Sequence, residues 1–505
     1  MLVELVLIPF LAIIAHILYK ECRRPKNFPP GPKWVLPVFG NLYLVYSLKQ
    51  KLGYLFLALE SLAEKYGPVY GLKLGQDVTV VITDYEIMKS VLTREEFQGR
   101  PNGYVFTMRT FGEKLGIAFG DGPTCMAMRN FTMKCLRDVG AGKETMNWYI
   151  TEEASEFVKM LKLSCGETNE TSKTIKLDEL FKLTILNSQW LLIAGKRFDY
   201  DDKEFIHLLD LVTGFLKNFD GAGGLVNRLP WIRFVAPELS GFNKLNDAIK
   251  PLQDFLWKII SDHKENFNCN AEHNNYVDLF LAEIFKQKEP SKIFNEKQLV
   301  SCLIDLLMAG MITTSDAMVD MLHFAAQNQE LQKELQAEID RVIGRNVAPT
   351  MDSYNEMVWM RAFNLETLRF ATIGPISVAR RATKDTTLMQ YRIPKDTVIV
   401  PVLHQALMDE RYWKDPHVFR PERFLNADKT EFIPDERVNI AFGLGKRRCP
   451  GDFITYRTMF LFMANILQNF TIQRDPNTVE GKLQWVEGIT LTPPPFTGTL
   501  KLRDE

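Results

Sequence analysis

One cysteine, Cys449, stands in a sequence context that could make it chemically active. It lies in a glycine-rich, basic loop from Ala441 to Gly451 (AFGLGKRRCPG), and an apolar run with helical character follows from Asp452 to about Gln468. The N-terminus of a helix carries partial positive charge and unpaired N–H groups, which favour a thiolate and can donate hydrogen bonds to its sulfur. The loop therefore predicts a reactive or metal-binding thiolate rather than the inert buried thiol that is the common state of a free cysteine.

The sequence leaves the role of this thiolate open between a nucleophile and a metal ligand. A nucleophile needs a histidine partner that the fold brings close, whereas an iron ligand needs a close, flat approach, which glycines permit. The seven cysteines and seven histidines are scattered, without a CxxC pair or an HExxH segment. This distribution excludes a zinc-finger spacing and a disulfide framework, and it gives no support to a histidine-based zinc hydrolase.

Length, composition and charge exclude several other classes of protein. The chain has 505 residues, of which 46% are hydrophobic and 24% charged, so we expect an ordinary folded body rather than a disordered or polytopic membrane protein. The 61 basic and 62 acidic residues give a net charge of −1. Because no overall positive field is present, the composition does not favour nucleic acid as a partner.

A second segment with unusual composition predicts one very long helix. Residues from Asn295 to about Ala326 follow a helical pattern, and Asn295 with Gln298 three positions later resembles a capping box. The mean length of an α-helix in globular proteins is only about 11 to 12 residues. The centre of the segment, 306–314, contains small residues including Gly310, although a glycine there costs about 1 kcal/mol relative to alanine. This pattern indicates either a large group lying against the helix or close packing of another helix.

The elements around these two segments predict a mainly α fold with small β-sheets. Residues 69–74 and 78–82 are β-rich on either side of Gly75, which is typical of a hairpin. Residues 489–491 and 499–502 suggest a smaller terminal β element. A charged segment with leucine or isoleucine every four residues from Leu331 is ended by a glycine, which predicts an amphipathic helix with a C-cap.

The N-terminal segment predicts a membrane anchor. Residues 2–19 are almost wholly apolar, and 18 residues at about 1.5 Å each span roughly 27 Å, near the thickness of a bilayer core. Four basic residues follow the segment, so the positive-inside rule places the rest of the chain in the cytosol. A cleaved signal peptide is the alternative, but its positive N-terminal region and A-x-A site are missing. We expect three parts: an anchor at 1–20, a basic, proline-rich linker at 21–32 and one catalytic domain at 33–505.

Nearly the whole chain, from the proline-rich linker to the last hairpin, resembles the cytochrome P-450 heme-thiolate monooxygenases. Three motifs carry the resemblance: F-x-x-G-x-R-x-C-x-G at 442–451, E-x-x-R at 366–369 and P-E-R-F at 421–424. An E-x-x-R pair alone is an ordinary ion pair of helices, but three motifs in the family's order and spacing are specific. The resemblance implies the cytochrome P-450 fold, a triangular, α-rich heme domain, behind an N-terminal transmembrane helix.

The resemblance also implies which residues bind the cofactor, heme b (iron protoporphyrin IX). Cys449 is expected to be the axial ligand of the heme iron, and Phe442 belongs to the same heme-binding loop. Arg447, Arg129 and Arg380 are expected to contact the heme propionates.

Other matching residues are expected to act in catalysis and in support of the loop. Thr313 is the expected catalytic residue, bonding either to the carbonyl of its own helix four residues earlier or to oxygen during the reaction. Glu366, Arg369 and Arg423 are expected to form a buried charge network that holds the cysteine loop.

The activity that the resemblance implies is insertion of one oxygen atom from O₂ into a lipophilic small molecule, by hydroxylation or epoxidation. NADPH would supply the electrons through a diflavin flavoprotein reductase docked on the cysteine side. The family's substrate-contact stretches, around 104–115, 215–229, 304–313, 373–378 and 492–497, are largely apolar here. The expected location is the endoplasmic reticulum membrane with a cytosolic catalytic domain, and the expected partners include membrane lipid but no nucleic acid.

Two residues depart from the family's pattern and keep alternatives open. Ile312 stands where the family has an acid thought to open a proton route, and Cys125 stands where tryptophan is usual. The alternatives are a peroxide-rearranging isomerase or dehydratase of the same fold, which needs no delivered protons, and a non-catalytic heme-binding protein. Retention of Thr313 and of the intact cysteine loop favours the monooxygenase.

Overall fold

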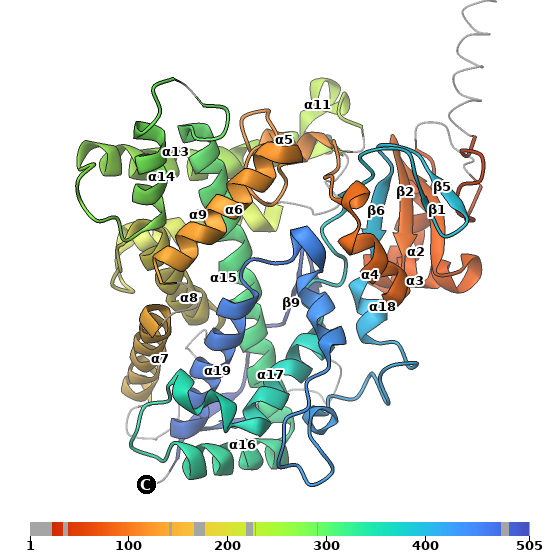
Figure 1. Cartoon of the computed structure of the whole chain (residues 1–505). Coiled ribbons are helices and arrows are strands. Elements are labelled where there is room, and N and C mark those ends of the chain that lie inside the picture. The colour runs from red at the N-terminus through yellow and green to blue at the C-terminus, as the bar shows by residue number, and fades with distance from the viewer. Residues whose placement is uncertain are drawn as a thin grey trace, which may run out of the picture.

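The computed structural model describes residues 23–33, 39–140, 144–165, 177–218, 226–227, 229–289, 291–475 and 484–503. The anchor expected at residues 1–20 lies outside these residues, as does the beginning of the expected linker. The described part is mainly helical with small β-sheets, which confirms the expected fold class (Figure 1).

The helices and strands have the following bounds. The α-helices are α2 (Leu42–Leu52), α3 (Leu55–Tyr66), α4 (Tyr85–Thr93), α5 (Tyr104–Met108), α6 (Gly122–Asp138), α7 (Glu144–Ser164), α8 (Leu177–Ala194), α9 (Lys203–Asn218), α11 (Ile232–Val235), α12 (Pro237–Ser240), α13 (Phe242–Glu265), α14 (Tyr276–Phe285), α15 (Glu296–Gln327), α16 (Gln329–Val342), α17 (Val358–Ala371), α18 (Leu403–Leu407) and α19 (Asp452–Asn469). The 3₁₀ helices are η1 (Glu95–Phe97), η3 (Met351–Asn355), η4 (Pro421–Phe424), η5 (Glu436–Phe442) and η6 (Gly445–Arg447). The strands are β1 (Val69–Leu74), β2 (Asp77–Ile82), β3 (Arg380–Arg381), β4 (Thr386–Leu388), β5 (Tyr391–Ile393), β6 (Val398–Pro401), β7 (Phe470–Gln473), β8 (Val486–Glu487), β9 (Leu491–Thr492) and β10 (Thr499–Leu502).

The longest helix, α15, runs through the core, and much of the fold is arranged around it (Figure 1). Helices α8, α13, α17 and α19 all pack against it. Its first turn is capped by Asn295, whose side-chain oxygen accepts the N–H of Gln298 at 2.9 Å. Among the described helices α15 alone is long and apolar enough to cross a membrane, but 72% of its most apolar window is buried within the protein. It is therefore a core helix, and the single long helix predicted from the sequence is confirmed.

The glycine at the centre of α15 allows another helix to approach closely. A Cβ atom at Gly310 would lie 2.1 Å from Nε2 of Gln189 on α8, so no larger residue fits without moving that side chain. Of the two interpretations of the small residues, close helix packing therefore applies to Gly310. The neighbouring residue Ala309 faces elsewhere and is exposed in the middle of the helix.

The largest sheet has four strands in the order β1-β2-β6-β3 and lies to one side of the helices (Figure 1). The predicted hairpin is confirmed: β1 and β2 are antiparallel with Val69 opposite Ile82. Strand β6 then adds to β2 in parallel, and β3 closes the order antiparallel to β6. This sheet matters for the site because β3 carries Arg380.

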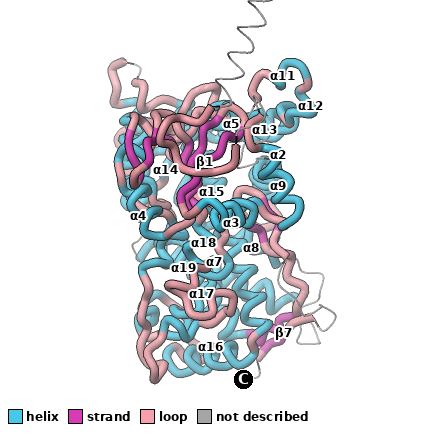
Figure 2. The backbone as a smooth tube through the Cα atoms, turned by 90° about the vertical axis from the view of Figure 1, so that its right-hand side faces the viewer, coloured by secondary structure: helices cyan, strands magenta, loops and turns pink. Residues whose placement is uncertain are grey.

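The C-terminal strands pair differently from the expectation. Residues 489–491 and 499–502 do not form one β element; instead β9 pairs with β8, and β10 pairs with β7 directly after α19. Figure 2 shows β7 at the end of the molecule opposite to β1. Three consecutive prolines, 493–495, separate β9 from β10 and withhold the N–H groups that a continuous hairpin would need.

The cap of α15 yields a prediction about stability. Replacing Asn295 with alanine should lower the free energy of unfolding by about 1 kcal/mol, because the N–H of Gln298 loses its acceptor. The measurement is urea unfolding of the heme-loaded protein. Asn295→Asp, which keeps an acceptor oxygen, is the control, and its free energy of unfolding should stay close to that of the parent. Equal stability of the parent and both variants would contradict the capping role.

Candidate functional site

The cysteine loop is closed by backbone hydrogen bonds that fix the position of the Cys449 sulfur. The N–H of Cys449 donates to the carbonyl of Phe442 at 2.7 Å, which joins the two ends of the loop. The N–H of Gly451 donates to the Cys449 Sγ at 3.4 Å. The thiol is half-buried. The sulfur is therefore held by the backbone, in a residue that keeps part of its surface accessible.

Two glycines in the loop adopt a backbone conformation that other residues avoid. Gly443 and Gly445 have φ angles of +69° and +70°. A Cβ atom at Gly445 would also lie 2.4 Å from the carbonyl oxygen of Leu92, at the end of α4. Any larger residue at 445 would be strained in its backbone and would clash with α4. The glycine-rich sequence is thus needed to fold the loop against α4.

The electrostatics of the loop differ from the expectation that it alone stabilises a thiolate. Burial raises the pKa of the Cys449 thiol above its usual range, and the N–H of Gly451 and the charges of Arg129 and Arg448 offset this only in part. Helix α19 begins at Asp452, three residues beyond the sulfur, and its N-cap is Gly451. The helix N-terminus therefore contributes one hydrogen bond to the sulfur, through the N–H of Gly451, and this lowers the pKa of the thiol by less than burial raises it. A bound metal cation would deprotonate a coordinating thiol outright.

Four arginines form a positively charged cluster in the interior on the same side as the cysteine loop. Arg100, Arg380 and Arg447 are buried and Arg129 is half-buried. Burial lowers the pKa of Arg100, Arg129 and Arg380, and repulsion among these guanidinium groups lowers it further. The pKa of Arg380 falls to about 9. Within the described part of the chain, none of the four forms an ion pair with a carboxylate.

Neutral groups of the protein satisfy part of the hydrogen-bonding capacity of this arginine cluster. Arg447 donates to the carbonyl of Gly120 at 3.0 Å and to the Cys125 Sγ at 3.3 Å. Arg129 donates to the carbonyl of Arg448 in the cysteine loop. Arg380 donates through Nη1 to Gln98 at 2.9 Å, while its buried Nε has no partner.

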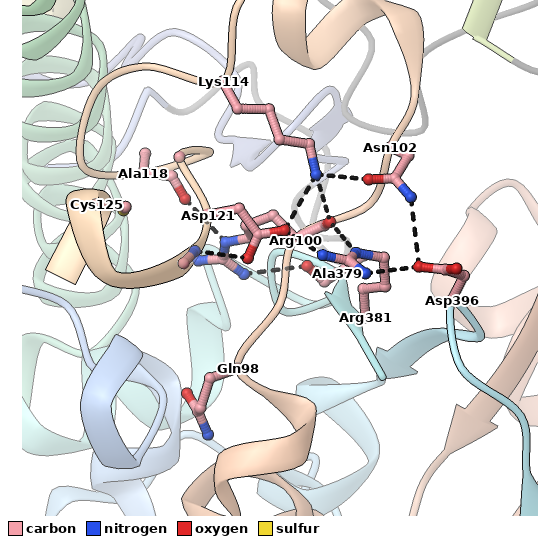
Figure 3. Close-up of polar contacts among 12 residues, drawn as sticks. Gln98, Arg100, Asn102, Lys114, Ala118, Asp121, Cys125, Ala379, Arg381 and Asp396 are labelled. Atoms are coloured by element: carbon pink, nitrogen blue, oxygen red, sulfur yellow. Dashed lines mark hydrogen bonds and ion pairs between the residues drawn. The ribbon is translucent and has the colours of Figure 1, made fainter. Parts of the chain in front are cut away.

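A network of charged side chains next to the arginine cluster pairs its cations with carboxylates, which the cluster does not do among the described residues (Figure 3). Lys114 and Arg381 both pair with Asp121, and Arg381 also pairs with Asp396 at 2.6 Å. Both cations also donate to the carbonyl of Arg100, which links the network to the cluster. The described part of the chain thus provides carboxylates for the cations of this network, but provides none for the arginine cluster.

The site residues fit a heme. Its two propionates would supply the negative charge that the arginine cluster lacks, and its iron would supply the cation that the Cys449 thiol needs. Among the described residues no three His, Cys, Asp or Glu side chains gather in a way that could hold a metal ion. A porphyrin, which brings its own nitrogen ligands, is compatible with a single thiolate.

One face of α15 carries the remaining predicted site residue. Thr313 is half-buried, and its hydroxyl donates to the carbonyl of Ala309 at 2.7 Å. This is the first of the two bonds expected for Thr313. Ile312 is half-buried too and packs against the hydrophobic core around α8 and α13, so it offers no proton at this point of the helix.

The predicted charge network around Glu366 is formed. Its carboxylate pairs with Arg369 at 2.7 Å and with Arg423 at 3.0 Å, and it accepts the N–H of Arg420 at 2.8 Å. Glu366 and Arg369 are 0% exposed. Arg369 further donates to the carbonyl of Leu407 at 2.9 Å. The network joins α17 to η4 and to the end of α18; it does not bond to the cysteine loop directly.

Sequence reasoning missed Arg100 and the setting of Cys125. Arg100 donates to the carbonyls of Ala118, Val378 and Ala379 at 2.8, 2.9 and 3.0 Å. Nothing in its local sequence distinguishes it from a surface arginine, because its burial depends on segments far away in the chain. Cys125, at the departure from tryptophan, accepts a hydrogen bond from Arg447 through its sulfur.

Comparisons with known proteins agree with this geometry. The cytochrome P450 family model matches residues 29–500. Farnesoate epoxidase of Bombyx mori is 37% identical over 492 residues, which cover 97% of each chain. Probable cytochrome P450 305a1 of Drosophila melanogaster is 33% identical over 96% of each chain. Cytochrome P450 2J2 of Homo sapiens is 33% identical over 93% of this chain and 90% of that protein.

The buried charge network around Glu366 predicts that a neutral substitution of this one residue lowers the stability of the protein strongly. Glu366→Gln should lower the free energy of unfolding by about 3 to 5 kcal/mol, because two buried guanidinium groups lose their counter-charge. Thermal unfolding of the heme-loaded protein measures the effect. Glu422→Gln, at an exposed neighbouring carboxylate that forms only a long ion pair, is the matched control and should change stability little; equal effects of the two substitutions would contradict this account.

Proposed function

This chain belongs to the cytochrome P450 family and is a heme monooxygenase, and from this premise we propose that it epoxidises a double bond of a linear terpenoid carboxylate or of its ester. The observation that carries the proposal is the match to farnesoate epoxidase along 97% of both chains. The apolar core cluster at the centre of α15 also supports it. Residues next to Ala309 on α15, such as Leu307 and Met308, belong to a large hydrophobic core cluster that also includes Val105 and Phe106.

We also propose a role for each residue around the heme. Cys449 would bind the heme iron through its sulfur, and the carbonyl of Phe442 closes the loop that holds this sulfur. Arg129, Arg380 and Arg447, together with Arg100, hold the propionates. The support for these roles is the absence of carboxylate partners for the four arginines in the described residues, together with the partial exposure of residue Cys449.

When bound, the heme activates O₂ after it has received two electrons, and the thiolate favours cleavage of the O–O bond. The residues of the chain contribute the binding, orientation and proton handling. Thr313 holds a hydroxyl proton on the exposed face of α15, fixed there by its bond to Ala309. The largely apolar stretches at 104–115, 304–313 and 373–378 would bind the hydrocarbon part of the substrate. These contributions favour oxygenation over peroxide rearrangement, since Thr313 is suited to pass protons on.

The proposed partner that supplies electrons is an NADPH-dependent diflavin reductase docked near the cysteine loop. Lys446 and Arg448 belong to this loop and have side chains 55% and 43% exposed. Each pairs with an acid of this chain, Glu95 and Asp452 respectively. Because such exposed pairs are weak, an acidic surface of a partner could compete for these cations.

The proposed location is the endoplasmic reticulum membrane, with residues 1–20 as anchor, 21–32 as linker and 33–505 as cytosolic catalytic domain. Helices α11 and α12 support attachment to a lipid surface. Trp231, Phe234, Val235 and Leu239, at or next to these helices, are between 51% and 76% exposed. An exposed apolar patch of this kind is typical of a surface that contacts lipid or another protein.

The proposed ligand can be tested by spectroscopy. In Cys449→Ala the reduced carbon monoxide complex should lose the red-shifted Soret band of thiolate ligation, because no sulfur remains at the iron. Cys269→Ala removes an exposed thiol instead and should keep the band. A Cys449→Ala protein that retains the band would refute the assignment.

The proposed substrate can be tested by product analysis. With NADPH and reductase, the purified enzyme should convert farnesoate or its methyl ester into an epoxide, and a saturated analogue of the same length should give none. Absence of epoxide with turnover of other lipophiles would refute the substrate but leave the monooxygenase. If the enzyme forms product from a lipid hydroperoxide without NADPH, but forms none from any parent lipid when NADPH and reductase are supplied, the monooxygenase activity itself is contradicted.

A further inference from the structure

A line of polar residues continues along α15 beyond Thr313. Asp316, Asp320 and His323 follow it at spacings of three, four and three residues, so all four lie on one face of the helix. This face is covered by the C-terminal segment. Asp316 accepts the hydroxyl of Thr492 at 3.0 Å, Asp320 accepts the indole N–H of Trp485 at 3.0 Å, and His323 contacts the carbonyl of Pro494 at 2.9 Å.

Asp316 is the acid closest to Thr313 along this face. Residues three apart on a helix have Cβ atoms about 5 to 6 Å apart, a distance that one water molecule can bridge between two polar groups. The carboxyl of Asp316 is 2% exposed, and only its Oδ2 has a hydrogen-bond partner among the described residues. Its Oδ1 is therefore available to a water molecule.

The other acids of α15 are less suited to serve Thr313. Asp305 lies eight residues before it, and both of its oxygens are occupied by Arg109 and by the N–H groups of Ile117 and Ala118. Asp320 lies seven residues beyond Thr313, about 10 Å along the helix axis. Ile312, at the position of the family's acid, has no proton to give.

The surroundings of Asp316 leave its carboxyl partly protonated at neutral pH. Burial raises the pKa of Asp316 to about 7. The Thr492 hydroxyl and Lys182 on α8 lower this pKa, and Asp178 on α8 raises it. Repulsion from Asp316 contributes to the raised pKa of Asp320, which is dominated by burial. An aspartate with an ordinary pKa would be ionised at this pH and could not donate.

We propose that Asp316 takes the place of the acid missing at position 312 and supplies protons to the Thr313 hydroxyl through one water molecule. The inference rests on the monooxygenase activity but not on the proposed substrate. Asp316 is a positioning residue in this scheme, because it acts through Thr313 rather than on the reacting atoms.

The proposed transfer balances in protons. Asp316 releases the proton of its carboxyl to the intervening water, and that water passes one proton to Thr313 as Thr313 gives its own to the reacting dioxygen. The carboxylate then regains a proton from solvent through the half-buried Thr492, whose hydroxyl donates to Oδ2. Each turnover consumes two electrons, which come from NADPH through the reductase, and two protons, so this proton transfer takes place twice while one oxygen atom enters the substrate and the other leaves as water.

The decisive variant is Asp316→Asn, which keeps an acceptor for Thr492 but has no acidic proton. Its rate of substrate oxygenation should fall by roughly a hundredfold, the lower end of what a positioned proton donor contributes, and NADPH should instead yield hydrogen peroxide. Ile312→Glu in this background should restore a large part of the lost coupling. Asp320→Asn, the same chemical change one turn farther from Thr313, is the matched control and should keep parental coupling.

The pH dependence gives a second readout. The rate in the parent enzyme should fall as pH rises through about 7, because Asp316 loses its proton there. In Asp316→Asn this decline should disappear, while Asp320→Asn should retain it. A purely structural role of Asp316 would lower the rate at every pH without removing the decline.

A third readout requires neither substrate nor turnover. Infrared spectra of the resting, heme-loaded enzyme should contain a carbonyl band of a protonated carboxylic acid that titrates near pH 7, is absent from Asp316→Asn and persists in Asp320→Asn. The red-shifted carbon monoxide band of each variant shows that it has folded. Parental coupling in Asp316→Asn, or an infrared band unchanged by that substitution, would overturn the proposal whatever the substrate proves to be.

Discussion

The buried positive charge of Arg100, Arg129, Arg380 and Arg447 is the constraint on which the rest of the site depends. A charge removed from water is costly unless it is paired, and these guanidinium groups repel one another with no carboxylate among the described residues to neutralise them. The same chain neutralises neighbouring cations with Asp121 and Asp396 (Figure 3). The arginine cluster is therefore complete only when an anionic group lies against it. The thiol of Cys449, whose pKa is raised by burial, likewise becomes a thiolate only with a cation.

The scaffold around this site consists of interactions that are complete without a cofactor. The Glu366 network is neutralised internally and joins α17 to η4, and the glycines of the cysteine loop fit against α4. Helix α15 passes through the core and is held by α8 at Gly310. One face of α15 then carries, in order, Ala309, Thr313 and Asp316, so the same helix positions both the oxygen-handling residue and its proposed proton source.

Local patterns in the sequence predicted much of this arrangement, and contacts between distant segments account for what they missed. The cap at Asn295, the long helix and the first hairpin depend on neighbouring residues and were predicted correctly. The pairing of β10 with β7 and the burial of Arg100 depend on segments more than 15 residues away. The sequence argument for a thiolate identified the helix N-terminus whose Gly451 N–H bonds to the sulfur, but it did not include burial, which raises the pKa of the Cys449 thiol.

The arginine cluster is proposed to hold an anionic prosthetic group, the heme. The most direct test of this role is the rate at which heme leaves the loaded enzyme and is captured by an excess of a heme-binding protein. Arg380→Met should accelerate release at least about tenfold, equivalent to 1.4 kcal/mol, because a buried cation that faces no carboxylate is lost. Arg381→Met, at the adjacent arginine that already pairs with two aspartates, should leave the rate of release nearly unchanged. Equal rates for Arg380→Met and the parent would contradict the account.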